Sequence, residues 1–488
     1  MATKKEIIAL FKDKRITIMG LGLLGGALND TIFLAEHGAD LTVTDLKTAE
    51  QLKSSLAKLK KYKNIKYVLA EHRLEDFREA DMILQPGNVP MDSVYLAEAK
   101  KNNIPVFVSE SLFAKYAEGV KLIGVTGTRG KSTTTQLIYE ILKVAFRQAQ
   151  GLKKKTTVFL AGNVKNVSTL ALLDKVNPPA GVGDIVVMEL DSWALHGMGD
   201  IKQSPYISVF TNFMVDHQNF YKDNMNLYFA DKANIFVYQK PDDYLVAGQE
   251  VLKLIQKKYK KWGSKVIVPD IGVLGGSTSK WKIKLLGEHN RQNIAYAVTV
   301  ARILDVPEKI IKKTVEGYKG VPGRLEFIRE IKGVKYYNDT TATTPDATLA
   351  ALKALKTGQN GTLKHSAGCS GKGGIVLISG GTDKSLDYRV YVKEVPKAVK
   401  NLILFKGTAT DKILKQLRIM NYELRIEIQK NKIPIVVVDN MKDAVILAKK
   451  YAVKNDIILL SPGAASFGIF KNEFDRGEQF VDKIKNIK

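Results

Sequence analysis

A glycine turn followed by a lysine, at residues 124–135, constrains the fold of this chain more than any other stretch. The sequence there is Gly-Val-Thr-Gly-Thr-Arg-Gly-Lys-Ser-Thr-Thr-Thr, between an apolar run and a helical pattern, which predicts strand, tight turn and helix. Backbone N–H groups of such a turn surround phosphate oxygens, Lys131 neutralises their charge, and Ser132 offers a hydroxyl to magnesium. The turn therefore predicts an ATP site, and an ordinary glycine-rich turn with a solvated lysine is the alternative.

Composition sets the outer bounds. The chain has 488 residues, of which 45% are hydrophobic and 26% charged, so we expect a globular protein of two to four domains. Its single cysteine, Cys369, argues against a disulfide framework and a cysteine-based zinc site. The start of the sequence lacks a signal-type apolar core, and no apolar run approaches the ~20 residues that span a bilayer. We expect a cytoplasmic protein that does not enter a membrane.

The net charge of +25 raises the possibility of a nucleic-acid-dependent ATPase. However, the lysines recur along the whole chain, for example at residues 60–63, 153–155 and 257–261, within otherwise polar stretches. Solvated surfaces explain such a distribution more simply. We therefore expect small-molecule substrates and no nucleic acid.

The first segment, residues 1–118, reads as a nucleotide-binding domain. An apolar run at 16–19 precedes the glycines of Gly20-Leu21-Gly22-Leu23-Leu24-Gly25, and a second apolar run at 41–44 ends in Asp45. In a Rossmann-like unit the glycines let the backbone approach a diphosphate, and an acid at the end of the second strand reaches a sugar hydroxyl. The pattern alone does not separate a nucleotide sugar from a redox dinucleotide, so an oxidoreductase remains an alternative here.

Two further segments repeat the alternation of apolar strands and helical patterns. The central one, residues 119–319, predicts a buried and mostly parallel sheet. It contains the glycine turn of residues 124–135, which is called the phosphate turn from here on. The third, residues 320–488, begins near Pro322-Gly323 and predicts a second open α/β sheet. Its Gly/Ser/Lys-rich stretch, residues 358–373, is interpreted as a surface loop. The expected strands are 82–84, 105–108, 121–125, 157–160, 185–188, 207–210, 374–379, 401–405, 433–438 and 457–460.

A set of short strings then occurs in one order along all three segments, and in this respect the chain resembles the Mur ligase family. The strings are the phosphate turn, Gly162-Asn163, Met188-Glu189-Leu190, Thr211-Asn212, Asp216-His217, Tyr228 through Lys232, Gly287 through Asn293, Pro322-Gly323-Arg324-Leu325-Glu326, Asn338-Asp339-Thr340-Thr341, Gly380-Gly381-Thr382-Asp383-Lys384 and Leu460 through Phe467.

The resemblance implies three α/β domains: a Rossmann-like domain for a nucleotide sugar, a central P-loop ATPase-like domain and a C-terminal Rossmann-like domain. It implies a monomeric ligase of peptidoglycan precursor synthesis that adds D-glutamate to UDP-N-acetylmuramoyl-L-alanine through an acyl phosphate. L-glutamate or another acceptor, and a folylpolyglutamate synthetase-like activity, are the alternatives. A dedicated first nucleotide domain argues against the folate enzyme, and the third segment argues against the oxidoreductase.

The resemblance also implies roles for individual residues. Two magnesium ions are expected, near Ser132, Glu189, His217 and Lys232, with Lys232 carbamylated. The catalytic set is Lys131, Glu189, His217 and Lys232. The ATP set is Gly127, Thr128, Gly130, Lys131, Ser132, Thr133, Asn290, Asn293, Arg324 and Asp339. The UDP-sugar set is Leu23, Leu24, Asp45, Gly87 and Asn163. The amino-acid set is Thr343, Lys384 and Ser466.

Without the resemblance, plainer interpretations compete for several of these residues. A lone histidine such as His217 is more often a satisfied loop residue than a ligand, and Lys232 is by default a surface lysine. Helical spacing places Lys232 on one face with Tyr228. The chain also departs from the family's pattern, with Arg129 where asparagine is common, Asp191 in place of a serine, and Glu473 where an aromatic residue is usual. The last change lies at the amino-acid end, so it puts the acceptor amino acid in doubt more than the ligation chemistry.

Overall fold

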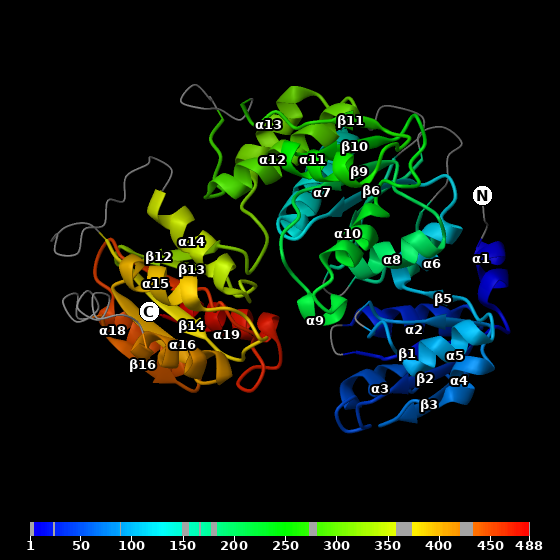
Figure 1. The fold of residues 1–488 in the computed structure, drawn as a ribbon, viewed down its shortest axis with the longest axis horizontal. Helices are drawn as coiled ribbons and strands as arrows, with labels where there is room; N and C mark the ends of the chain where they lie inside the picture. The colour runs from blue at the N-terminus through cyan, green and yellow to red at the C-terminus, as the bar shows by residue number, and fades with distance from the viewer. Residues whose placement is uncertain are drawn as a thin grey trace. The chain divides into compact units, whose positions relative to one another are not determined.

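The computed structural model describes residues 4–22, 25–87, 89–148, 156–164, 167–176, 183–272, 281–357, 373–419 and 433–487. These residues form two compact units, each described by itself below (Figure 1). The first unit is Met1–Trp281 with Gln292–Val315, and the second is Lys282–Arg291 with Glu316–Lys488. The first unit contains two sheets and the second contains one.

The N-terminal sheet has five parallel strands in the order β3-β2-β1-β4-β5. Its strands are β1 (Arg15–Met19), β2 (Asp40–Asp45), β3 (Ile65–Leu69), β4 (Met82–Leu84) and β5 (Val106–Phe107). Its helices are α1 (Lys4–Phe11), α2 (Gly26–Glu36), α3 (Lys53–Leu59), α4 (Leu74–Arg78), α5 (Val94–Lys101) and α6 (Ser109–Tyr116). The strand order reverses between β1 and β4, and crevices at such points bind ligands in open α/β sheets.

The middle sheet has six parallel strands in the order β11-β10-β9-β6-β8-β7. They are β6 (Lys121–Thr126), β7 (Val158–Gly162), β8 (Ile185–Glu189), β9 (Ile207–Phe210), β10 (Tyr244–Ala247) and β11 (Lys265–Ile267). The connecting helices are α7 (Lys131–Gln148), η1 (Leu170–Asp174), α8 (Ser192–Asp200), α9 (Gln218–Tyr221), α10 (Met225–Ala233), α11 (Gln249–Lys258), α12 (Glu288–Ile303) and α13 (Glu308–Gly317). The phosphate turn follows β6, whose neighbour β8 ends at Glu189 and whose neighbour β9 leads into the segment that carries His217.

One apolar core runs through both sheets of the first unit. Helix α6 packs against η1 and α8, and α2 also packs against η1. Phe113 of α6, Leu170 of η1 and Leu195 of α8 are fully buried in this shared core. Burial of such a side chain contributes roughly 1.5–3 kcal/mol. The two sheets are therefore joined by packing as well as by the chain.

The sheet of the second unit has the order β12-β13-β17-β14-β15-β16. Its strands are β12 (Glu326–Ile331), β13 (Val334–Asn338), β14 (Ile375–Gly380), β15 (Asn401–Phe405), β16 (Ile435–Val438) and β17 (Ile457–Leu460). Its helices are α14 (Pro345–Thr357), α15 (Arg389–Ala398), α16 (Thr408–Ile419), α18 (Met441–Tyr451) and α19 (Glu473–Lys485). Separate apolar clusters cover its two faces.

The α/β fold class expected from the sequence is confirmed, and each strand expected there corresponds to a strand of the structure within one or two residues at its ends. The third sheet is mixed, because β12 pairs antiparallel with β13. Residues 358–372 of the expected surface loop lie outside the described residues. No helix in the described ranges is long and apolar enough to cross a membrane. The expected domain boundaries at 118 and 319 stay predictions.

Candidate active site

The phosphate turn joins the end of β6 to the start of α7, and two of its glycines are required by geometry. Gly127 and Gly130 have φ of 141° and 84°, in the region that favours glycine. A Cβ atom at Gly130 would lie 2.3 Å from Oδ1 of Asn293, so no larger residue fits there without displacing that amide. The Nζ of Lys131 donates to the carbonyl oxygens of Gly127 at 2.9 Å and Thr128 at 3.3 Å. The side chain of Lys131 therefore folds back over the turn and hydrogen-bonds to its backbone.

Lys232 lies in α10 and is buried, with 1% of its surface exposed. Its Nζ donates to the carbonyl of Gly127 at 3.1 Å and to Oγ1 of Thr126 at 3.3 Å, and lies 4.9 Å from the centroid of the Tyr228 ring. Burial, and then the charge of Lys131, lower its pKa well below the ordinary value of a lysine. Within the described ranges it forms no ion pair with a carboxylate. The structure excludes the surface-lysine alternative.

His217 lies just before α9, at the end of the segment that follows β9. Its ring centroid is 4.9 Å from that of Trp193 and 5.7 Å from that of Tyr228. Burial lowers the pKa of the imidazole and outweighs the opposite effect of Asp216. A neutral imidazole is the form that binds a metal ion. His217 therefore meets the electrostatic requirement for a ligand.

Glu189 is the last residue of β8 and is 4% exposed. It pairs in register with Val125 of β6 and with Gly162 of β7, so its side chain leaves the sheet at the level of the phosphate turn. The backbone N–H of Asn163 donates to the carbonyl of Glu189 at 2.9 Å. The strand register thus brings Glu189, Asn163 and the turn to one edge of the middle sheet. Ser132 and Thr133 follow in the first turn of α7.

Asn290 and Asn293 both lie in α12, and they have different surroundings. Asn293 is 4% exposed and its amide lies against Gly130 of the phosphate turn. Asn290 is 8% exposed, and its Nδ2 donates to the carbonyl of Leu286 at 2.8 Å. Contacts within the first unit place Asn293 at the turn.

In the N-terminal sheet, Asp45 is 3% exposed and contacts backbone. Its Oδ2 accepts from the N–H of Leu21 at 2.9 Å, and its Oδ1 accepts from the N–H of Lys47 at 2.9 Å. The carboxylate therefore ties the glycine turn after β1 to the end of β2. Leu23 and Leu24, which were also expected to contact the nucleotide sugar, lie outside the described residues.

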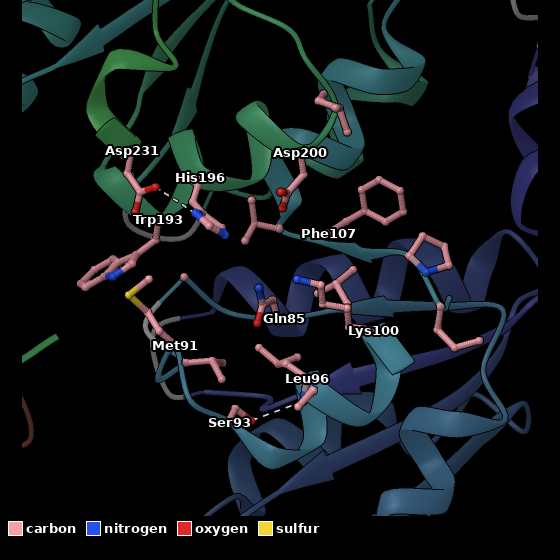
Figure 2. Close-up of a pocket in the computed structure, with 18 of the residues that line it drawn as sticks. Gln85, Met91, Ser93, Leu96, Lys100, Phe107, Trp193, His196, Asp200 and Asp231 are labelled. Atoms are coloured by element: carbon pink, nitrogen blue, oxygen red, sulfur yellow. Dashed lines mark hydrogen bonds and ion pairs between the residues drawn. The ribbon is translucent and has the colours of Figure 1, made fainter. Parts of the chain in front are cut away.

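Gly87 follows β4 and lines a cavity of about 1370 Å³ between the α5 and β5 side of the N-terminal sheet and helix α8. Figure 2 shows Trp193, His196 and Asp231 on one wall, with Met91, Ser93 and Leu96 opposite them. Oδ1 of Asp231 accepts from Nδ1 of His196 at 2.9 Å, and its Oδ2 accepts from the hydroxyl of Tyr221 at 2.9 Å. None of Lys131, Glu189 and Lys232 lines this cavity. These three residues lie at the phosphate turn and at the end of β8 instead.

In the second unit, Asp339 follows β13 and is buried. Its Oδ1 accepts from the N–H of Leu325 at 2.9 Å, and its Oδ2 accepts from Oγ of Ser461 at 2.8 Å. Burial raises its pKa to about 7, although these hydrogen bonds and the charge of Arg324 oppose the rise. The Arg324 side chain is exposed.

The residues expected to hold the amino acid gather at the loops that follow β13, β14 and β17. The Nζ of Lys384 donates to Oγ1 of Thr343 at 3.4 Å, and Lys384 is exposed. Thr382 pairs with Ala465 through two backbone hydrogen bonds of 3.0 Å, which bring the Lys384 loop beside the loop of Ser466. Ser466 is 4% exposed. The second unit thus brings all three residues to one edge of its sheet.

Sequence reasoning gave no role to several residues that shape the turn. Thr211 and Asn212 follow β9 and bond to the turn, and the Tyr228 hydroxyl lies 3.4 Å from Oγ1 of Thr128. For Thr211 and Asn212, the position directly after an apolar strand was the available signal. Asp216 is the fourth such residue and contacts both Arg129 and His217.

Fold and site together define an α/β nucleotide-binding enzyme with a phosphate turn on a central parallel sheet. The Mur ligase middle domain matches residues 125–272, and the glutamate ligase domain of Mur ligases matches residues 323–463. UDP-N-acetylmuramoylalanine--D-glutamate ligase of Roseiflexus sp. (strain RS-1) is 33% identical, over 96% of this chain and 97% of that protein. The protein of that name from Borreliella afzelii (strain PKo) is 34% identical over the same shares.

Solved structures share the fold. UDP-N-acetylmuramate-alanine ligase MurC of Thermotoga maritima aligns with a TM-score of 0.58 and 17% identity, over 97% of this chain and 100% of that chain. MurF ligase of the same organism, in complex with ADP, aligns with a TM-score of 0.52 and 15% identity, over 97% and 95%. The chain belongs to the Mur ligase family, and it is a ligase.

Proposed function

We propose that this ligase adds D-glutamate to UDP-N-acetylmuramoyl-L-alanine at the expense of ATP, in peptidoglycan precursor synthesis. The name carried by full-length relatives supports this reaction. The observation that carries the proposal is the convergence of Lys131 and Lys232 on the carbonyl of Gly127, at the edge of the sheet where β8 delivers Glu189. A cationic lysine, a buried lysine whose pKa is lowered, and a carboxylate at a glycine turn suit the transfer of a phosphoryl group.

The reaction we propose has two steps. A carboxylate oxygen of the alanyl group attacks the γ-phosphorus of ATP, the bond to the bridging oxygen of ADP breaks, and an acyl phosphate forms. The amine of D-glutamate then attacks the acyl carbon, the C–O bond to phosphate breaks, and an amide, inorganic phosphate and a proton result. Such chemistry needs positioning and charge neutralisation more than covalent catalysis.

The turn and its neighbours would bind and orient ATP. The N–H groups of Gly130 to Thr133, at the start of α7, would bind the phosphates as a helix N-terminus does, and Lys131 would exchange its two backbone acceptors for phosphate oxygens. Asn290 and Asn293 are proposed to contact adenine or ribose, Arg324 to contact the γ-phosphate, and Asp339 to contact ribose. ATP use agrees with ADP bound in the MurF structure.

The residues present fit two magnesium ions, for which we propose Ser132 and Glu189 at one and His217 and Lys232 at the other. Within the described ranges there is no cluster of three or more histidine, cysteine or acidic side chains. Magnesium sites in phosphoryl-transfer enzymes need only one or two carboxylates, since substrate phosphates supply other ligands. When bound, the ions would neutralise charge that develops on the transferred phosphoryl group.

We further propose that Lys232 is carbamylated, which would add a carboxylate to this set. Its amine is buried, contacts neutral acceptors at 3.1 and 3.3 Å, and has a lowered pKa, so an uncharged form able to attack carbon dioxide is accessible. The attack forms a C–N bond and releases a proton. Labelling with ¹³C-bicarbonate should give a carbamate resonance in the wild type that Lys232→Ala lacks. A resonance in both proteins, or in neither, would refute the assignment.

The remaining substrates are assigned to residues of the N-terminal, middle and third sheets. We propose that Leu23, Leu24, Asp45, Gly87 and Asn163 contact the UDP-sugar, and that Thr343, Lys384 and Ser466 hold the amino acid. The corresponding domains are 1–118, 119–319 and 320–488. The exposed ammonium of Lys384 suits a carboxylate of the incoming glutamate. We also propose a monomer that acts in the cytoplasm on these small molecules, without nucleic acid or membrane.

A panel of D- and L-amino acids with UDP-N-acetylmuramoyl-L-alanine tests the function directly. ADP release and product mass should both depend on D-glutamate. Turnover with L-glutamate instead would show that this family member uses a different acceptor amino acid. ADP release that depends on nucleic acid, or no turnover with any pair, would overturn the proposal.

A further inference from the structure

Residue 129 of the phosphate turn is fixed by the two residues that follow β9. Its backbone N–H donates to Oδ1 of Asn212 at 2.8 Å. Its carbonyl accepts from Oγ1 of Thr211 at 2.6 Å and from Nδ2 of Asn212 at 3.0 Å. With both main-chain groups engaged, the backbone at Arg129 has one orientation, which sets the direction of its side chain.

The guanidinium of Arg129 reaches the carboxylate that precedes His217. Its NH1 donates to Oδ2 of Asp216 at 2.7 Å, and the two side chains are 33% and 23% exposed. Oδ1 of the same carboxylate accepts from the backbone N–H of His217 at 2.9 Å. One carboxylate thus bridges the phosphate turn and the backbone that carries the imidazole.

The segment from 213 to 217 is held by different contacts at its middle and at its two ends, where Phe213 packs on the Tyr228 and Phe229 rings and His217 on Trp193. Met214 and Val215 are 47% and 63% exposed, so burial anchors this part of it weakly. His217 has a φ of 53°, a left-handed conformation that costs a residue with a side chain roughly 1–2 kcal/mol. Thr128 adds hydrogen bonds to the backbone of Met214, at 2.9 and 3.2 Å. Polar contacts with the phosphate turn therefore hold the middle of this segment, and aromatic packing of Phe213 and His217 holds its two ends.

We propose that Arg129 is a positioning residue that fixes the imidazole of His217 relative to the phosphate turn, through Asp216. This inference rests on the proposed function, in which His217 is a magnesium ligand. A lysine could supply the charge but only one of the fixed directions of a guanidinium. An asparagine side chain is too short to reach Asp216 and carries no charge.

The kinetic test compares Arg129→Ala, Asp216→Asn and the double variant with the wild type. Each single change should lower kcat about 10- to 100-fold, as misplacement of a catalytic group does, and leave the KM for ATP within about 3-fold. The kcat of the double variant should be no lower than that of the less active single variant, because both changes remove the same Arg129–Asp216 contact. Arg129→Lys should recover part of the loss. Arg15→Ala is the matched control, since Arg15 forms a 2.8 Å pair with Asp81 at the surface of the N-terminal sheet; its kcat should match the wild type.

A second readout does not depend on turnover. Trp193 packs edge-on against His217. The chain has three tryptophans, so the substitutions Trp262→Phe and Trp281→Phe make Trp193 the single source of tryptophan fluorescence. In that background, Arg129→Ala and Asp216→Asn should change the Trp193 emission by similar amounts. Arg15→Ala should leave the Trp193 emission unchanged. This result would support the link even if D-glutamate proved not to be the substrate.

Two outcomes would overturn the inference. Unchanged Trp193 emission with additive kinetic losses would show that Arg129 and Asp216 act separately. Binding of ADP that weakens about 10-fold or more in Arg129→Ala, measured by calorimetry in the absence of magnesium, would make Arg129 a phosphate contact instead.

Discussion

The edges of the middle and third sheets both carry lysines with proposed roles, but the two sites differ in burial. Around the phosphate turn, Lys232 and Glu189 are 1% and 4% exposed, and the amine of Lys232 already has hydrogen-bond partners. On the third sheet, Lys384 is exposed and has a long contact of 3.4 Å to Thr343. A buried polar group is held in place before ligands arrive, whereas an exposed one is ordered by them. Changes at the first site should therefore lower kcat, and changes at the second should raise KM.

The largest effect is expected for Lys131→Ala. Removing the cation of the phosphate turn should lower kcat about 10³-fold, in the range observed when a preorganised electrostatic contact is lost. A steady-state assay of ADP release measures this. Lys143→Ala, on the same helix and half-buried without a proposed role, is the control. A loss of kcat below about 10-fold would contradict the expectation that changes at the buried site mainly lower kcat.

Lys232→Ala should be nearly as severe, with a loss of kcat of about 10²-fold or more, because it removes a group buried at the same turn. Added formate or acetate should restore part of the activity if the missing group is a carboxylate. The thermal midpoint of the variant should be measured alongside, since the lost side chain also fills space beside Tyr228. Full activity without rescue would contradict both the burial argument and the carbamate.

Lys384→Ala should raise the KM for D-glutamate about 10- to 30-fold, the loss expected for one charge-assisted hydrogen bond, and leave the KM for ATP unchanged. Initial rates at varied D-glutamate give the value. Lys412→Ala is a useful comparison, because Lys412 pairs with Asp383 in the same loop region at 3.1 Å without a proposed substrate contact. An equal loss in kcat at saturating D-glutamate would remove the distinction between the two sites.

The smallest effect is a pH dependence of stability in the second unit. Asp339 has its pKa raised from 3.8 to about 7 by burial, so the folded state binds its proton more tightly than the unfolded state. Its stabilising contribution is complete below about pH 4 and is lost as the pH rises to about 7, at roughly 1 kcal/mol per pH unit in between. Urea unfolding from pH 5 to 6.5 should show this slope in the wild type, and Asp339→Asn should flatten it. Parallel slopes would contradict the raised pKa.

The strands that build the site could be predicted from the sequence because they are buried on both faces. β6, β8 and β14 are continuous apolar runs, as parallel strands between helices are. By contrast, β3 and β12 carry exposed polar residues such as Lys66 and Glu330, and their patterns do not separate an edge strand from a loop. The antiparallel pairing of β12 with β13 was missed for that reason.

Within the site, local spacing predicted local neighbours and little more. Lys232 was expected on one helix face with Tyr228, and the structure confirms it, with the amine 4.9 Å from the ring. The burial of Lys232 depends on Thr126 and Gly127, more than a hundred residues away in sequence, and no local pattern reveals it. The same holds for Asp45, whose expected sugar contact gave no hint that its carboxylate binds the backbone of the glycine turn.

The apolar core shared by α6, η1 and α8 bears on how the protein can be divided. A fragment ended at residue 118 would leave Phe113 without Leu170 and Leu195, and would present to water a surface that the intact chain conceals. Such a piece should self-associate or be degraded, although its sheet has the strand order of a complete nucleotide-binding domain. Ligand studies on the N-terminal sheet therefore belong in a polypeptide that keeps the middle sheet attached.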